Sequence, residues 1–173
     1  RGSTKLAEAR LPYDIVFLIN RFLEAASQAV VDAGGQPNQF VGDGLLALFG
    51  LDVNPATACR QAIRAAAMVA SNVEYMNHEF VTELQEPIQF GIGIHGGEVI
   101  IGNIGFSDHT GVTALGDAVN VSARLQDMTQ PLAYTVIFYE EVRLHAGIGT
   151  SDVDRTAVTI RGQRPHNGRG TAT

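Results

Sequence analysis

A single aspartate between two glycines is the first residue whose type and setting could bind a metal ion or a phosphate. Asp43 stands in the segment Gly42-Asp43-Gly44, and short apolar runs flank that segment on both sides. Two such runs joined by a glycine-containing turn predict a β-hairpin with the carboxylate at its tip. Small neighbours let a metal ion or a phosphate come close. Hairpin turns also favour aspartate for conformational reasons, so Asp43 alone stays open between a metal ligand and a turn residue.

A second pair of polar side chains has the spacing of one helix face. Asn120 and Arg124 lie four residues apart in residues 117–126, where the apolar positions recur with helical spacing. An amide and a guanidinium side by side suit a phosphorylated ligand, because the guanidinium fork pairs with phosphoryl oxygens and its charge is permanent. A solvated helix face carries the same residue types, and the pair alone does not decide between these interpretations.

A glycine-rich stretch around His95 predicts a strand, a turn and a second strand. It reads Gly-Ile-Gly-Ile-His-Gly-Gly-Glu-Val over residues 91–99. Glycines inside a strand mark places where another backbone or a ligand comes close. His95 is interpreted as a packing or turn residue, since the sequence has no serine elbow, no phosphate loop ending in Gly-Lys-Ser/Thr and no His-x-x-x-His zinc pattern.

Composition indicates one globular domain and excludes several classes of protein. The chain has 173 residues, of which 45% are hydrophobic, and its net charge of −6 argues against a nucleic-acid partner, which would require a basic surface. Cys59 is the only cysteine, so an internal disulfide is impossible and a cytoplasmic domain is expected. No apolar run approaches the roughly 20 residues of a membrane helix, and no signal peptide is recognisable, so we expect no membrane contact by this domain.

Helices and strands alternate in an order typical of an α+β domain. Periodicity predicts helices over residues 11–33, from Asn54-Pro55 to about residue 80, 117–126 and 140–145, and strands over 39–41, 45–49, 88–95, 98–104, 135–139 and 157–161. Strands 88–95 and 98–104 are expected to pair across Gly96-Gly97, and residues 106–111 are expected to form a polar loop. The elements predict helices packed on one mostly antiparallel sheet.

The first four residues, Arg1 to Thr4, read as the end of a strand and its turn. We therefore expect residues 1–173 to be a single domain from a longer protein, in which an anchor or a sensor domain could precede it. A strand before Arg1 would complete a βαββαβ core.

Four segments, in this order, resemble the catalytic domain of class III adenylate and guanylate cyclases. They are residues 1–4, 40–50, 91–105 and 115–125. The first is similar to the end of the family's Asp-Ile-Arg-Gly-Phe-Thr, the second to its second-metal hairpin, the third to its central hairpin and the fourth to its transition-state helix. The resemblance covers nearly the whole chain. It implies the nucleotide cyclase fold, a ferredoxin-like βαββαβ core whose first strand is missing from this chain.

The resemblance also implies how the active site is divided. Members of the family hold two Mg²⁺ or Mn²⁺ ions on two aspartates, and Asp43 matches the second of these. The first aspartate would lie two residues before Arg1. Asn120 falls where an asparagine orients the ribose, and Arg124 falls where an arginine stabilises charge on the transferred α-phosphate. The site forms between two protomers, with the metal ligands from one chain and the asparagine and arginine from the other.

Further positions matching the family would bind the substrate. Backbone amides of Gly2, Ser3 and Thr4 would hold the β- and γ-phosphates, and a basic residue near the last strand, either Arg161 or Arg164, would touch the terminal phosphates. The base-reading positions carry Gln39 and Thr113. Thr113 matches one adenylate-type subclass, whereas Gln39 departs from both the adenylate lysine and the guanylate glutamate.

The resemblance predicts a homodimeric adenylate cyclase that converts ATP into 3′,5′-cyclic AMP and pyrophosphate in signal transduction. A flippable Gln39 amide also fits guanine, so a guanylate or dual-specificity cyclase stays an alternative. A catalytically degenerate nucleotide-binding or dimerisation domain is a second alternative, disfavoured because Asp43, Asn120 and Arg124 occur together. A diguanylate-cyclase-like domain would need Gly-Gly-Asp/Glu-Glu-Phe at the hairpin, which is absent. A plain structural domain does not explain the four segments.

Overall fold

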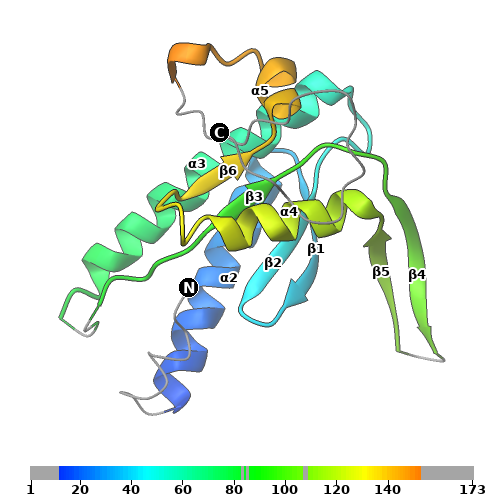
Figure 1. The fold of residues 1–173 in the computed structure, drawn as a ribbon. Coiled ribbons are helices and arrows are strands. Elements are labelled where there is room, and N and C mark those ends of the chain that lie inside the picture. Colours follow the sequence, from blue (N-terminus) through cyan, green and yellow to red (C-terminus); the bar gives the residue numbers. More distant parts are fainter. Residues whose placement is uncertain (1–11, 83, 85, 107–108, 153–173) are drawn as a thin grey trace.

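A computed structural model describes residues 12–82, 84, 86–106 and 109–152 of the chain. Its helices are α2 (Pro12–Asp32), α3 (Pro55–Glu79), α4 (Asp117–Met128) and α5 (Glu140–Ala146), with a 3-10 turn, η1 (Thr150–Asp152) (Figure 1). Its strands are β1 (Gln36–Val41), β2 (Gly44–Leu48), β3 (Ile92–Ile94), β4 (Ile100–Phe106), β5 (His109–Leu115) and β6 (Val136–Phe138). The mixture of helices and strands is the α+β class that the sequence predicts.

The strands of the described residues form three pairs. β1 and β2 pair antiparallel, β4 and β5 pair antiparallel, and β3 pairs with β6 in parallel. β1 also lies beside β5, which brings the first two pairs together. Two of the three pairs are antiparallel, as expected, but within these ranges hydrogen bonding does not join them into one sheet.

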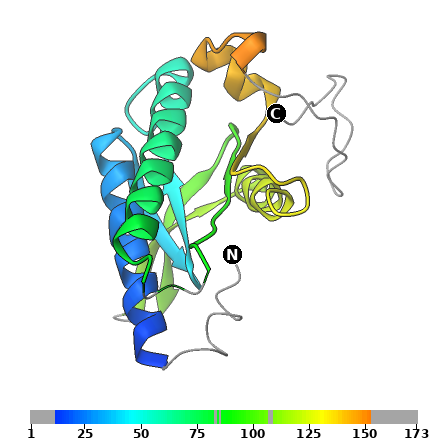
Figure 2. The ribbon, with the colours of Figure 1, turned by 90° about the vertical axis from the view of Figure 1, so that its left-hand side faces the viewer.

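Helices cover the strands from two sides. α2 and α3 lie side by side on one side, and α4 lies on the other (Figure 2). The contact between α2 and α3 is made of small and β-branched residues, Ala26, Ala29, Val69 and Val73. On the other side, Val121 and Leu125 of α4 pack on Ile137 of β6. These two apolar clusters fix α4 relative to β6 and α3 relative to α2, because buried side chains interlock at close-packed density.

Local signals at the start of α3 behave as the sequence predicts. The Asn54 side chain accepts a hydrogen bond of 2.9 Å from the backbone N–H of Thr57, and Pro55 occupies the first turn. An asparagine cap satisfies a helix N–H that has no partner inside the helix, and proline loses nothing there, since its missing N–H would have had none. The predicted helix start is therefore confirmed.

The region between α3 and α4 differs from the prediction. The expected strand 88–95 is limited to Ile92–Ile94 and pairs with β6, so its predicted hairpin with residues 98–104 is wrong. The expected loop 106–111 is also wrong in part, because residues 109–115 form β5 against β4. Pairing with distant segments decides both cases. Residues 109–115 contain threonine and valine, which suit a strand once a partner strand is present, whereas the glycines near β3 allow α4 to pack closely there. The expected strand 157–161 lies outside the described residues.

Candidate active site

Asp43 lies at the tip of a two-residue hairpin. Val41 of β1 pairs with Gly44 of β2, which leaves Gly42 and Asp43 as the central residues of the turn. Gly42 has a φ of +60° and Asp43 does not have a positive φ, which is the pattern of a type II′ turn with glycine first. The Asp43 side chain is exposed, and a Cβ added at Gly42 would meet nothing within 4 Å. The hairpin predicted from sequence is confirmed, and its carboxylate is open to a ligand.

Asn120 and Arg124 lie on the outward face of α4. Both residues are exposed, whereas Val121 and Leu125, one position further along the helix in each case, are buried against β6. The i, i+4 spacing places the amide and the guanidinium one turn apart on the same side. α4 therefore presents the two polar groups outward while its other face is fixed to the strands.

Three glycines let α4 approach the strands closely. A Cβ at Gly93 of β3 would lie 2.1 Å from the Ser122 backbone oxygen and 2.5 Å from the Gln126 backbone nitrogen. A Cβ at Gly97 would lie 2.8 Å from the Ala118 Cβ, and one at Gly116 would lie 2.8 Å from the Glu98 backbone oxygen. Because no side chain fits at these points, glycine is required where α4 meets its support. The sequence had indicated a close backbone or a ligand here, and at Gly93 it is a backbone.

Gln39 and Thr113 lie on neighbouring strands. Gln39 is exposed on β1, directly after a bulge between Pro37 and Gln39, and Thr113 is half-buried on β5, opposite Gly102. β1 lies beside β5, so one ligand can meet both strands. A bulge turns the following side chain relative to the regular ladder, and Gln39 is the first residue after it.

Asp43 lies in one part of the chain, and Asn120 and Arg124 lie in another. The β1–β2 hairpin with Asp43 packs on α2 and beside β5, whereas α4 with Asn120 and Arg124 packs on β3 and β6 (Figure 1). The structure thus brings Asn120 and Arg124 together, but it does not pack their helix on the hairpin that carries Asp43. Gly2, Ser3, Thr4, Arg161 and Arg164 lie outside the described residues.

His95 packs on an aromatic ring that sequence reasoning did not connect with it. Its imidazole lies 4.7 Å from the Tyr139 ring, centroid to centroid, at an interplanar angle of 54°. Burial lowers the pKa of His95, and the negative charges of Glu141 and Asp117 oppose that effect. The interpretation as a packing residue is confirmed. Tyr139, Glu141 and Asp117 lie 44, 46 and 22 residues away from His95 in sequence, and no local pattern marks them.

The acidic groups of the described residues do not form a closed metal cage. No group of three or more His, Cys, Asp or Glu side chains able to hold a metal ion occurs within those ranges. Mg²⁺ is commonly held by one or two carboxylates together with substrate phosphates and water rather than by protein alone. A single exposed aspartate at a glycine-flanked turn fits that way of binding.

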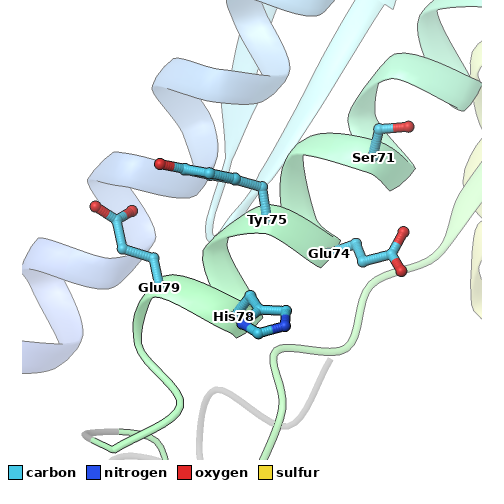
Figure 3. Close-up of a pocket in the computed structure, with 5 residues that line it drawn as sticks. All are labelled: Ser71, Glu74, Tyr75, His78 and Glu79. Atoms are coloured by element: carbon cyan, nitrogen blue, oxygen red, sulfur yellow. The ribbon is translucent and has the colours of Figure 1, made fainter.

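A shallow hollow is lined by none of the polar residues named above. Its lining is drawn from one helix, α3, and consists of Ser71, Glu74, Tyr75, His78 and Glu79 (Figure 3). Because α3 and α4 lie on opposite sides of the strands (Figure 2), this hollow is separate from Asn120 and Arg124. Among the described helices, none is both long and apolar enough to span a bilayer.

Comparison with known proteins agrees with the fold and the motifs. Residues 1–168 match the family described as Adenylate and Guanylate cyclase catalytic domain. An adenylate cyclase of Anabaena cylindrica is 34% identical over 146 residues, which cover 82% of this chain and 28% of that protein. This chain therefore spans little more than a quarter of that relative.

Solved structures give the same assignment. The guanylyl cyclase Cya2 superposes with a TM-score of 0.82 at 23% identity, over 99% of this chain and 85% of that one. A bacterial light-regulated adenylyl cyclase superposes with a TM-score of 0.79 at 27% identity, over 99% of this chain and 48% of that one. The exposed hairpin aspartate, the polar face of α4 and the match over residues 1–168 lead to one conclusion: this chain belongs to the adenylate and guanylate cyclase catalytic domain family.

Proposed function

We propose that the chain converts ATP into 3′,5′-cyclic AMP and pyrophosphate in a site shared by two copies of itself. The observation that carries the proposal is the separation of Asp43 from Asn120 and Arg124. Each group is exposed, yet each packs on different elements of the protomer. A two-fold axis that sets the hairpin of one copy against α4 of the other would complete two equivalent sites.

The reaction closes a ring within one substrate molecule. The ribose 3′-oxygen attacks the α-phosphorus and forms a new P–O bond, while the bond from the α-phosphorus to the bridging oxygen breaks. Pyrophosphate leaves with that electron pair, and the 3′-hydroxyl proton passes to solvent. Because attacker and target belong to one molecule, orienting the ribose is a large part of catalysis. Asn120 would hold the ribose in the attacking geometry.

Arg124 would act on the charge that develops at the α-phosphate. Its guanidinium keeps its charge and can donate two hydrogen bonds to phosphoryl oxygens. A group that binds the transition state better than the substrate raises turnover rather than affinity. We therefore expect Arg124→Ala to lower kcat by about 100-fold or more and to change KM little, by analogy with the loss of one oxyanion donor.

Asp43 would hold Mg²⁺ or Mn²⁺ from the partner protomer's side of the site, two ions per site being the expectation from the family. When bound, such ions neutralise phosphate charge and lower the pKa of the attacking hydroxyl. The exposed carboxylate and the open space over Gly42 fit an ion that also binds the triphosphate. Gly2, Ser3, Thr4 and either Arg161 or Arg164 are proposed to bind the phosphates, and comparing KM for ATP in Arg161→Ala and Arg164→Ala would identify which arginine does so.

Exposed apolar residues support a homodimer. Phe40, Val41 and Ile100 are 59%, 62% and 76% exposed, and Ile101 and Leu115 on the neighbouring strands are exposed as well. All five lie on β1, which belongs to the Asp43 hairpin, or on β4 and β5, which come before α4 in the chain. Large apolar side chains left exposed on neighbouring strands suit an interface with another chain. A second copy buried there would bring the two halves of the site together.

Mixing two inactive variants tests the shared site. Asp43→Ala and Arg124→Ala chains, each folded and each with less than a few per cent of wild-type activity, are combined in equal amounts. Random exchange makes half of the dimers mixed, and each mixed dimer has one intact site of two, so about a quarter of the wild-type cyclic AMP production returns. Mixing two Arg124→Ala preparations is the control. No recovery, with subunit exchange shown by mass spectrometry, would contradict a site shared between protomers.

ATP is proposed as the substrate because Thr113 is an adenylate-type residue and neither base-reading position carries a carboxylate for guanine. The Anabaena cylindrica adenylate cyclase, at 34% identity, supports the same choice. Gln39 is neutral and its amide can donate or accept, so activity on GTP as well is the second candidate. Discrimination is then modest, since either base finds a partner at Gln39.

Substitution of Gln39 by lysine separates these candidates. An ammonium donates to adenine N1 but cannot accept from guanine N1. An unpaired polar edge costs about 1–3 kcal/mol, so the ratio of kcat/KM for ATP to that for GTP is expected to rise about tenfold in Gln39→Lys. Gln36→Lys, at the other end of β1, is the matched control. An unchanged ratio would show that Gln39 does not read the base, and strong GTP preference in the wild type would favour the guanylate cyclase.

A further inference from the structure

His95 lies where three elements of the fold meet. It directly follows β3, and the backbone N–H of Tyr139, the residue before α5, donates to the Ile94 oxygen over 3.4 Å. The His95 and Tyr139 rings lie 4.7 Å apart. Two residues on, Gly97 backs on Ala118 of α4, and a Cβ at Gly97 would lie 3.8 Å from His95 Nε2. The imidazole therefore packs on Tyr139, the residue before α5, and lies near Gly97, whose other neighbour is Ala118 in the first turn of α4.

The surroundings of the imidazole suit its neutral form. Its Nδ1 atom is buried and has no hydrogen-bond partner within the described residues. Burial is the largest influence on the pKa of His95 and lowers it, while Glu141 of α5 and Asp117 of α4 raise it. The phenol of Tyr139, whose pKa is raised by burial and by Glu141, stays neutral over the same range. A proton on Nδ1 would place a charge and an N–H where no acceptor faces them.

Protonation would thus draw the ring out of its packed position and toward a carboxylate. The two carboxylates that act on it lie in the first turns of α4 and α5. Asp117 begins the helix whose next turn carries Asn120. A shift of His95 toward Asp117 would therefore disturb the helix that also carries Arg124.

We propose that His95 is a positioning residue, which in its neutral form packs the start of α4 against the start of α5 and so holds Asn120 and Arg124 where turnover requires them. Protonation of His95 releases that packing and lowers kcat. The inference rests on the proposed function, because it assigns Asn120 and Arg124 to the cyclisation site. A purely structural His95 would not make kcat depend on its protonation, whereas a positioning His95 does.

The first test is the pH dependence of kcat in the full-length protein between pH 5.5 and 8.5. In the wild type, kcat falls about tenfold per pH unit below a midpoint that lies under pH 6.5, and KM for ATP changes much less. His95→Phe keeps a ring for Tyr139, and His95→Gln keeps a neutral polar group; neither can be protonated in this range. Both variants lose this acid limb. Profiles of kcat that superimpose on the wild type in either folded variant would overturn the proposal.

The second test does not depend on activity. The His95 imidazole is titrated by NMR in the wild type and in variants of the neighbouring carboxylates. Asp117→Asn and Glu141→Gln each lower the His95 midpoint, whereas Asp127→Asn, at the far end of α4, leaves it unchanged. A His95 midpoint that stays the same in Asp117→Asn would contradict the proposed interaction of His95 with the start of α4. If neither ATP nor GTP is cyclised at any pH, the proposed function fails. The titration still decides whether Asp117 of α4 changes the pKa of His95.

Discussion

Replacing Gly93 by alanine tests how the fold positions α4, the helix proposed to carry two catalytic residues. The added Cβ would lie 2.1 Å from the Ser122 oxygen, 2.5 Å from the Gln126 nitrogen and 2.9 Å from the Leu125 Cβ, and contacts under 3.0 Å are essentially never seen for a Cβ. Two of these neighbours are backbone atoms, which cannot rotate away. α4 must therefore move relative to β3, and it carries Asn120 and Arg124 with it.

The size of that movement sets the expected loss of activity. Relieving a 2.1 Å contact to at least 3.0 Å requires a displacement of about 0.9 Å. A misplacement of about 1 Å can cost about 100-fold in rate when catalysis depends on positioning. Overpacking of a tight contact also costs about 1–3 kcal/mol of stability. We expect Gly93→Ala to fold with a lowered Tm and to lose kcat about 100-fold, with a smaller change in KM.

Gly96→Ala is the matched control for this substitution. Gly96 lies three residues further along, and a Cβ there would meet nothing within 4 Å. The assay compares kcat and KM for cyclic AMP formation from ATP with Mn²⁺, and circular dichroism and urea unfolding report the folded fraction. Gly93→Ala that keeps more than half of the wild-type kcat, or an equal loss in Gly96→Ala, would refute the reasoning.

Two further predictions concern stability. The Asn77 side chain accepts a hydrogen bond from the Ile88 N–H over 2.6 Å and donates one to the Ile88 oxygen over 3.1 Å. Asn77→Ala leaves these two part-buried backbone groups without that partner and is expected to lower the free energy of unfolding by about 1–3 kcal/mol. Urea unfolding measures this change, and a loss below about 0.5 kcal/mol would contradict the prediction. Burial lowers the pKa of His95 in the folded protein, so the folded state disfavours the protonated imidazole. The contribution of neutral His95 to stability is therefore complete above the unfolded-state pKa of about 6.5 and is lost as the pH falls through the lower pKa of the folded state. Unfolding by urea at pH 7.5 and 5.5 checks this: His95→Phe is expected to reduce the difference between the two, and an equal difference in both proteins would count against it.

Local features of the fold could be predicted from sequence because each has a short-range cause. The Gly42-Asp43 turn follows from glycine at the position that needs a positive φ. The start of α3 follows from Asn54 as cap, and the helix over residues 117–126 follows from its recurring apolar residues. The buried face was predicted only in part, because Ala123, expected to point inward, is exposed and Val121 is buried instead. In each case the residues that decide the structure lie within one turn of one another.

Features that depend on distant partners could not be predicted. β3 pairs with β6, about 44 residues later, rather than with the segment that follows it. β5 was expected to begin as a loop because His109 to Gly111 reads as polar, and its strand exists through pairing with β4. The packing of His95 on Tyr139 leaves no periodic signal. Glycine at Gly93 indicated a close approach, but only the structure identifies α4 as the neighbour.

We propose above that this chain makes cyclic AMP from ATP with Arg124 acting in the transition state. The most direct measurement incubates the purified protein with equal concentrations of ATP and GTP and with Mn²⁺, and identifies the products by mass spectrometry. We expect pyrophosphate and more cyclic AMP than cyclic GMP. Cyclic AMP production is expected to fall about 100-fold in Arg124→Ala and to stay unchanged in Arg64→Ala, which replaces an exposed arginine on α3. Absence of both cyclic nucleotides from a folded dimer, or full activity in Arg124→Ala, would contradict it.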